Sequence, residues 1–394
     1  MSRIRAYLDH NATSPLHPAA REAMCAAFGL RGNASSIHAE GRAARTLIET
    51  ARAEVATFAG VAPKGVVFTS GGTEALNLAL TPHIETRGEK SRPFDLLLAG
   101  AGEHPAVLAG HRFAPAQLEL AGLTPLGVLD LDALGEALSR ASAAGHRVML
   151  AIQAANNETG VIQPVLEAAA MIHAAGGLLV CDAVQAVGKI ACDIGGLGAD
   201  AFVFSAHKFG GPKGAGALCF GAASYYIKDA LLRGGGQEGG LRAGTENIAG
   251  IAGMAAALSA AKARLGEQAT ALALWRDEME TEIARIVPGA VFFGARAERL
   301  PNTSCFALPS IAAQVLLIGL DLEGFAVSSG SACSSGKVKR SHVLSAMGVE
   351  PELALGAVRV SLGWNSRRED CVSFVQALER TVKTIRARRN KPAA

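Results

Sequence analysis

The chain has 394 residues, of which 49% are hydrophobic and 19% charged, and its formal net charge at pH 7 is +3. Such a length exceeds the size at which one hydrophobic core usually stops growing, so we expect a large and a smaller domain. The weak net charge and the scattered basic residues argue against a nucleic-acid-binding protein.

The cysteines and the hydropathy of the sequence exclude further classes of protein. The seven cysteines are an odd number with no C-x-x-C pair, which argues against a disulfide framework and a structural zinc site and predicts a reducing compartment, the cytoplasm. The first 18 residues lack the apolar core of a secretory signal. No segment reaches the roughly 20 apolar residues of a membrane helix; residues 248–261 come nearest and predict a buried helix.

Short apolar runs alternate with helical patterns through the first two thirds of the chain. Helices are expected over residues 37–58 and 73–80. The apolar runs are residues 66–68, 96–98, 148–152, 178–180, 201–204 and 217–220. This alternation predicts an α/β fold with a mainly parallel sheet between helices, in which ligands bind at the carboxyl ends of the strands.

The pattern changes near residue 269. A long mixed-charge helical pattern is followed by apolar runs at 291–293 and 302–307 and by a final strand-helix segment. We therefore predict a large domain over residues 16–262 and a small domain formed by residues 1–15 and 263–394.

The first strand end with unusual chemistry follows the run at 66–68. Ser70, Gly71, Gly72 and Thr73 form a glycine turn at the start of a predicted helix, where backbone N–H groups bind phosphate. The segment lacks the P-loop pattern, which favours one phosphate on Gly72 and Thr73 over a nucleotide. Taken alone, it fits an ordinary helix cap equally well.

Two later strand ends carry charges. Asp182 ends the run at 178–180, and a buried aspartate needs a charged partner such as the pyridine nitrogen of pyridoxal phosphate (PLP); a helix N-cap is the alternative. Lys208 follows the run at 201–204 and precedes a glycine-rich turn. Alone, Lys208 reads as a surface lysine, but Asp182 and Lys208 together favour a ligand site.

Segments along nearly the whole chain resemble PLP enzymes of fold type I, in the class V aminotransferase branch, and specifically cysteine desulfurases of the NifS/IscS type. The resemblance implies a large domain with a mainly parallel sheet between helices and a smaller α+β C-terminal domain. The matching segments are residues 8–13, 33–38, 69–77, 103–104, 156–160, 182–188, 205–214, 234–248, 328–335 and 359–363.

The resemblance also implies roles for cofactor-binding residues. Lys208 resembles the lysine that binds PLP covalently, Asp182 the partner of the pyridine nitrogen, and Gln185 the ligand of the ring hydroxyl. His104 is expected to stack on the ring and to move protons. The phosphate ligands implied are Gly72, Thr73, Ser205 and His207, with Thr245 from a neighbouring subunit, so a homodimer is expected.

The substrate L-cysteine is expected to bind through its carboxylate. Arg359 offers a planar fork for bidentate contact, and the resemblance places Asn157 nearby and also assigns Asn33 to substrate binding. The alternative for Arg359 is a solvated arginine on a strand, and the alternation of residues along the strand does not decide between them.

Cys333 separates desulfuration from amino-group exchange. Small residues surround it in Ser-Ser-Gly-Ser-Ala-Cys-Ser-Ser-Gly, which predicts a mobile, exposed loop. A thiolate there can attack the substrate sulfur and become a persulfide, with L-alanine as the other product.

The sulfur acceptor implied by the resemblance is an iron–sulfur scaffold protein or another sulfur-transfer partner. No intrinsic metal is expected; Cys333 would make at most a transient iron–sulfur contact shared with a scaffold. Residues 336–340 are more basic than is usual in the family, and Trp364-Asn365 replaces a common arginine. A housekeeping role and a role in nitrogenase assembly, and so in nitrogen fixation, both stay open.

Two other functions remain open from the sequence. A selenocysteine lyase or an aminotransferase would use the same cofactor residues but would not depend on Cys333. A non-catalytic sulfur-relay or assembly subunit is the alternative from another class, and the presence of Lys208, Asp182 and Arg359 argues against it.

Overall fold

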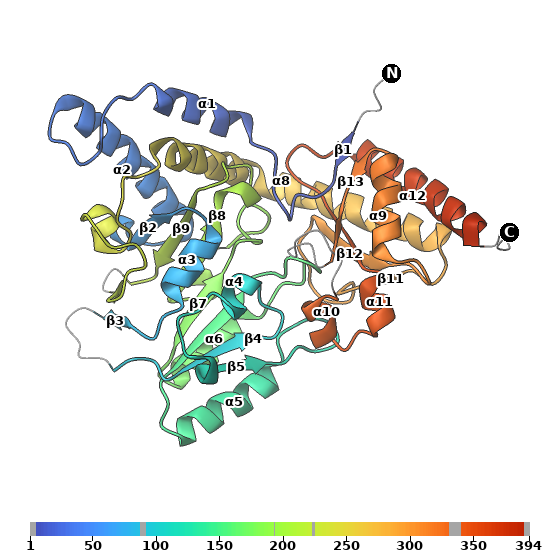
Figure 1. The fold of residues 1–394 in the computed structure, drawn as a ribbon, viewed down its shortest axis with the longest axis horizontal. Helices are drawn as coiled ribbons and strands as arrows, with labels where there is room; N and C mark the ends of the chain where they lie inside the picture. The colour runs from blue at the N-terminus through green and yellow to red at the C-terminus, as the bar shows by residue number, and fades with distance from the viewer. Residues whose placement is uncertain (1–4, 87–91, 193, 223–224, 331–339, 390–394) are drawn as a thin grey trace.

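The structure, a computed structural model, describes residues 5–86, 92–192, 194–222, 225–330 and 340–389. The N-terminal and central elements form a region around a large sheet, and the orange and red C-terminal elements lie beside it (Figure 1). The long helix α8 (Ile248–Ile286) runs from one region into the other.

The large sheet has seven strands in the order β2-β9-β8-β7-β6-β4-β5. Only β9 runs antiparallel to its neighbours, so the predicted mainly parallel sheet is confirmed. All six predicted runs are strands of this sheet, and the edge strand β5 was missed. The bounds are β2 (Val66–Thr69), β4 (Leu96–Gly100), β5 (Leu118–Ala121), β6 (Val148–Gln153), β7 (Leu178–Asp182), β8 (Ala201–Ser205) and β9 (Gly216–Phe220).

The sheet is buried on both faces, which explains why its strands are continuous apolar runs. Met149 of β6 packs in one cluster with Leu76, whereas its neighbour Leu150 packs in another with Ile48 and Met254. Successive side chains of a strand point to opposite faces, so each run supplies both cores.

Helices cover these faces. The helices predicted over 37–58 and 73–80 are confirmed as α2 (Ala39–Ala59) and α3 (Gly72–Ala79). The other helical segments of this region are α1 (Pro18–Phe28), α4 (Pro105–Leu108), α5 (Leu131–Ala143), α6 (Val165–Ala174) and α7 (Ile194–Leu197), with 3-10 turns η1 (Pro63–Gly65), η2 (Pro115–Gln117), η3 (Ala206–Lys208) and η4 (Gln237–Gly240). A two-stranded sheet pairs β3 (Ile84–Thr86) with β10 (Tyr225–Ile227).

Helix α8 is the one described helix whose length and composition would allow it to cross a membrane. It packs against α1 and α2, and Met254 and Leu258 on it are buried. These contacts are those of a core helix, as expected for residues 248–261. The predicted domain boundary at residue 262 falls inside α8, and the division into two domains stays a prediction.

The C-terminal region contains a four-stranded antiparallel sheet in the order β11-β12-β15-β14. Its strands are β11 (Val291–Phe292), β12 (Thr303–Ala307), β15 (Val358–Ser361) and β14 (Ser328–Ser329), and its helices are α9 (Ala313–Leu322), α10 (His342–Ala346), α11 (Pro351–Leu355) and α12 (Arg368–Arg389). The N-terminal strand β1 (Ala6–Tyr7) pairs with β13 (Phe325–Ala326), so the first described residues join this region.

Candidate active site

A cavity of about 330 Å³ lies at the carboxyl ends of β6, β7 and β8 and at the start of α3. This is the edge of the sheet where ligands of α/β folds bind. Ten predicted site residues line it: Gly72, Thr73, His104, Asn157, Asp182, Gln185, Ser205, His207, Lys208 and Arg359.

Lys208 and Asp182 enter this cavity from neighbouring strand ends. The Nζ of Lys208 donates to the backbone carbonyls of Asn11 at 2.6 Å and Ala12 at 3.0 Å. Oδ1 of Asp182 accepts the backbone N–H of Val184 at 2.9 Å. Burial raises the pKa of Asp182 to about 6, although that hydrogen bond and the charge of Lys208 oppose the shift. A buried carboxyl group of this kind is stabilised as an anion by a cationic partner.

The turn before α3 leaves little room for side chains. A Cβ on Gly72 would lie 2.7 Å from Cγ2 of Val184, so glycine allows the helix start to reach the cavity wall. A hollow beside the cavity is lined by this turn together with Ser205, His207 and Lys213. Backbone N–H groups, a hydroxyl group and a lysine form a donor set suited to a phosphate.

His104 caps α4, and its Nδ1 accepts the backbone N–H of Ala106 at 3.1 Å. Burial, together with the charges of Lys208 and His342, lowers the pKa of His104 to about 4. The ring is therefore neutral near pH 7, and because Nδ1 is an acceptor, Nε2 carries the proton.

Arg359 is 2% exposed, which excludes the alternative of a solvated arginine. Its Nη1 donates to the backbone carbonyl of Asn157 at 2.8 Å, and its Nη2 pairs with Asp9 at 2.9 Å. The buried Nε has no hydrogen-bond partner among the described residues. The guanidinium group is thus held at the cavity wall with donor capacity remaining.

Three residues of the site had no predicted role: Asp9, Asn11 and Lys189. Asp9 and Asn11 belong to the N-terminal segment, and Lys189 follows Gln185 by four residues. Nζ of Lys189 donates to Oε1 of Gln185 at 2.6 Å and to Oδ1 of Asn11 at 2.9 Å. The available sequence signal for Lys189 was its spacing of four residues after a predicted ligand.

Two predicted residues lie elsewhere, and a third is outside the described residues. Thr245 and Asn33 are exposed and do not line the cavity of their own chain. Cys333 lies outside the described residues, which resume at Arg340. The flanking residues are close to the site, because Ser328 pairs with Arg359 in the sheet and His342 Nε2 lies 2.8 Å from the backbone carbonyl of Glu103. Across the described ranges, no cluster of three His, Cys, Asp or Glu side chains could hold a metal ion.

Comparisons with known proteins decide the family. The profile of the aminotransferase class-V family matches residues 6–374. The chain belongs to this family. The resemblance drawn from the sequence is confirmed, and the class-V fold places the chain among the fold type I PLP-dependent enzymes.

The chain aligns over nearly its whole length with proteins named as cysteine desulfurases. The chain is 37% identical to the cysteine desulfurase IscS of Dictyoglomus turgidum, over 96% of this chain and 95% of that protein. It is 38% identical to an IscS-like cysteine desulfurase of Mycobacterium tuberculosis, over 99% and 98%. A solved structure of a NifS-like protein from Rickettsia africae superposes with a TM-score of 0.85 at 32% identity, covering 96% of this chain and 99% of that chain.

Proposed function

We propose that this protein is a PLP-dependent cysteine desulfurase, which converts L-cysteine to L-alanine and holds the sulfur as a persulfide on Cys333. One observation carries the proposal: a single cavity gathers Lys208, Asp182 and Arg359 in a chain whose similar proteins are named cysteine desulfurases.

The chemistry of the cavity wall fits PLP. Asp182 is a buried carboxyl group that would be stabilised by a pyridinium nitrogen. The start of α3, Ser205 and His207 would hold the phosphate, and Lys208 would form the covalent link, leaving its two backbone acceptors. When bound, PLP supplies an electron sink for negative charge at a substrate carbon.

The remaining residues of the cavity would bind and orient the substrate. Arg359, with Asn157 beside it, would hold the carboxylate of L-cysteine, and Asp9 would keep the guanidinium group in place. His104 would stack on the cofactor ring and present the proton on Nε2. Asn33 is kept as a proposed substrate ligand.

The sulfur step requires a thiolate on Cys333. The thiolate attacks the sulfur of L-cysteine, the carbon–sulfur bond breaks, and a proton returns to the carbon, so that L-alanine and a Cys333 persulfide form without an external oxidant. The outer sulfur of the persulfide then passes to an acceptor protein. An iron–sulfur scaffold or another sulfur-transfer protein is the proposed acceptor. A transient iron–sulfur contact of Cys333 belongs to that transfer.

Assembly and location follow from the same proposal. Thr245 is exposed and away from the cavity of its own chain, a position suited to reaching the phosphate site of a second copy in a homodimer. Cys25, Cys181, Cys219, Cys305 and Cys371 are free thiols, which fits a reducing compartment and supports a place in the cytoplasm.

The test is to incubate the purified, PLP-loaded protein with L-cysteine and a thiol reductant and to quantify L-alanine and sulfide. Equal amounts of both products, lost in Cys333→Ala and retained in Cys25→Ala, are expected; Cys25 is an exposed cysteine and serves as the matched control. A colourless protein would refute the proposed binding of PLP. Alanine formation that is indifferent to Cys333 would favour another class-V reaction.

A further inference from the structure

A second buried lysine lies behind the wall that carries Lys208. Lys189 is 9% exposed, and its Nζ makes two hydrogen bonds, to the side-chain oxygens of Gln185 and Asn11. Both acceptors belong to residues that line the proposed cofactor cavity. Lys189 itself does not line that cavity, so any effect on a ligand there must pass through its neighbours.

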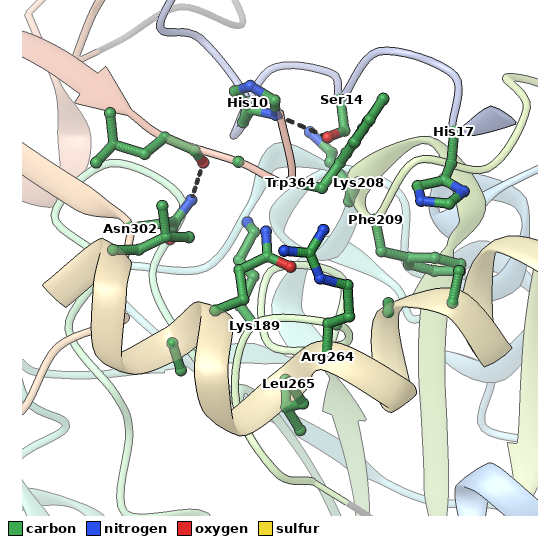
Figure 2. A pocket seen from close by; sticks show the side chains of 18 residues that line it. His10, Ser14, His17, Lys189, Lys208, Phe209, Arg264, Leu265, Asn302 and Trp364 are labelled. Carbon is green, nitrogen blue, oxygen red and sulfur yellow. Dashed lines mark hydrogen bonds between the residues drawn. The ribbon is translucent and has the colours of Figure 1, made fainter. Parts of the chain in front are cut away.

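The surroundings of Lys189 are cationic. It lines a small cavity of about 40 Å³ on the other side of the wall, and Figure 2 shows it there with the cationic side chains of Lys208 and Arg264. None of the described residues that line this cavity is an aspartate or a glutamate. Burial, together with the charges of Lys208 and Arg359, lowers the pKa of Lys189 well below its ordinary value.

The hydrogen bonds of Lys189 fix the orientation of an amide. Nζ of Lys189 donates to Oε1 of Gln185, so this amide presents its oxygen to Lys189 and its nitrogen elsewhere. One N–H of that nitrogen donates to the backbone carbonyl of Asn11 at 3.0 Å. The amide group has a second N–H, which remains for an acceptor in the cavity.

The same argument applies to Asn11. Its Oδ1 accepts from Lys189 and, at 3.1 Å, from Nδ2 of Asn302. Its Nδ2 therefore points away, and it donates to Oγ1 of Thr303 at 2.9 Å. Through these bonds Lys189 connects the N-terminal segment to the loop after β7.

We propose that Lys189 is a positioning residue which holds Gln185 with its amide nitrogen, and not its oxygen, toward the ring oxygen of the cofactor. The inference rests on the proposed PLP binding and adds a residue to it. Without Lys189, the amide of Gln185 loses the donor to its oxygen, and only the carbonyl of Asn11 still distinguishes its two orientations. A carbonyl oxygen turned toward an anionic ring oxygen would repel it, whereas an N–H group stabilises it.

The experiment uses PLP-loaded protein and measures the visible absorption of the bound cofactor as a function of pH, in addition to the dissociation constant for PLP. Hydrogen bonds to the ring oxygen favour its unprotonated state, so their loss raises the pH midpoint of the absorption change. Lys189→Met is expected to raise this midpoint by about one pH unit, which corresponds to one charge-assisted hydrogen bond. Gln185→Leu is expected to raise it similarly.

A double-mutant cycle separates positioning from general disturbance. If Lys189 acts through Gln185, Lys189→Met has no further effect on the midpoint in the Gln185→Leu background. An unchanged midpoint in Lys189→Met, or an equal shift in both backgrounds, overturns the proposal. If Lys189→Met does not fold, Lys189→Arg, which retains donors for both oxygens, must keep the wild-type midpoint. A wild-type protein that binds no PLP would refute the proposed function instead.

Discussion

The carboxyl group of Glu158 lies between the two described segments that flank residues 331–339. Ser341 donates its hydroxyl to Oε2 at 2.5 Å, and a Cβ on Gly330 would lie 3.2 Å from the same oxygen. Glu158 is 3% exposed, and burial raises its pKa to about 7 against the opposing effects of Ser341 and Arg359. Ionisation of this group is therefore linked to the folding of the described segments on either side of residues 331–339.

The sign follows from the raised pKa. The folded protein holds the proton of Glu158 more tightly than the unfolded chain, so the contribution of this group to stability is full below about pH 4.5 and is lost as the pH rises to about 7. Glu158→Gln keeps the shape of the side chain and removes the titration. Relative to this variant, the wild type should lose about 2 kcal/mol of unfolding free energy between pH 5 and pH 7.

The assay is chemical denaturation of both proteins at pH 5, 6, 7 and 8. The difference in unfolding free energy should change between pH 5 and 7 and level off above pH 8. Glu136→Gln is the matched control, because the Glu136 side chain is 79% exposed and its replacement should leave the difference constant. A flat difference for Glu158→Gln as well would refute the assignment of a buried, proton-binding carboxyl group.

Two further substitutions test the site and its support. Arg359→Lys is expected to raise KM for L-cysteine about tenfold or more, because one ammonium group cannot replace both the planar guanidinium fork and its contacts with Asp9 and Asn157. Steady-state kinetics measure this effect, with Arg299→Lys as the control, since Arg299 pairs with Glu280 outside the cavity. An unchanged KM in Arg359→Lys contradicts the prediction. Gly363→Ala is expected to lower the unfolding free energy by about 3 kcal/mol, because the added Cβ overlaps the buried ring of His10. Gly122→Ala is the control, because a Cβ at this position would have no atom within 4 Å. Equal changes in the melting temperature of both variants would count against the predicted overlap.

The sequence predicted the large sheet because its strands are buried on both faces and read as apolar runs. The edge strand β5 escaped this criterion, since three of its four residues, including the exposed Leu120, are not buried. The antiparallel direction of β9 was not predictable from its composition, which matches that of its parallel neighbours. The sequence also did not predict that α8 continues as one helix past residue 269, where the charge pattern changes. Buried and exposed residues alternate along this helix, so the change in pattern does not mark its end.

Asp182 and Lys208 were predictable because charged residues after apolar runs are uncommon; Asp182 ends β7 and Lys208 follows β8. The partners that hold the site were not, because they come from distant parts of the chain. Asp9 pairs with Arg359 across 350 positions, and Asn11 accepts from Lys189 across 178. No local pattern carries such a pairing, although both residues belong to the N-terminal segment that the family resemblance had already marked.

That segment explains why the cavity needs both regions of the chain. Its backbone forms hydrogen bonds to both regions. The carbonyl of Asn11 accepts from Nζ of Lys208, and the N–H of Asn11 donates to the hydroxyl group of Ser361 in β15. Lys208 is thus oriented by main-chain acceptors, which a side-chain substitution at Asn11 or Ala12 does not remove. Because Ser361 lies two residues after Arg359 on the same strand, the docking of one short segment sets the positions of Lys208 and Arg359 together.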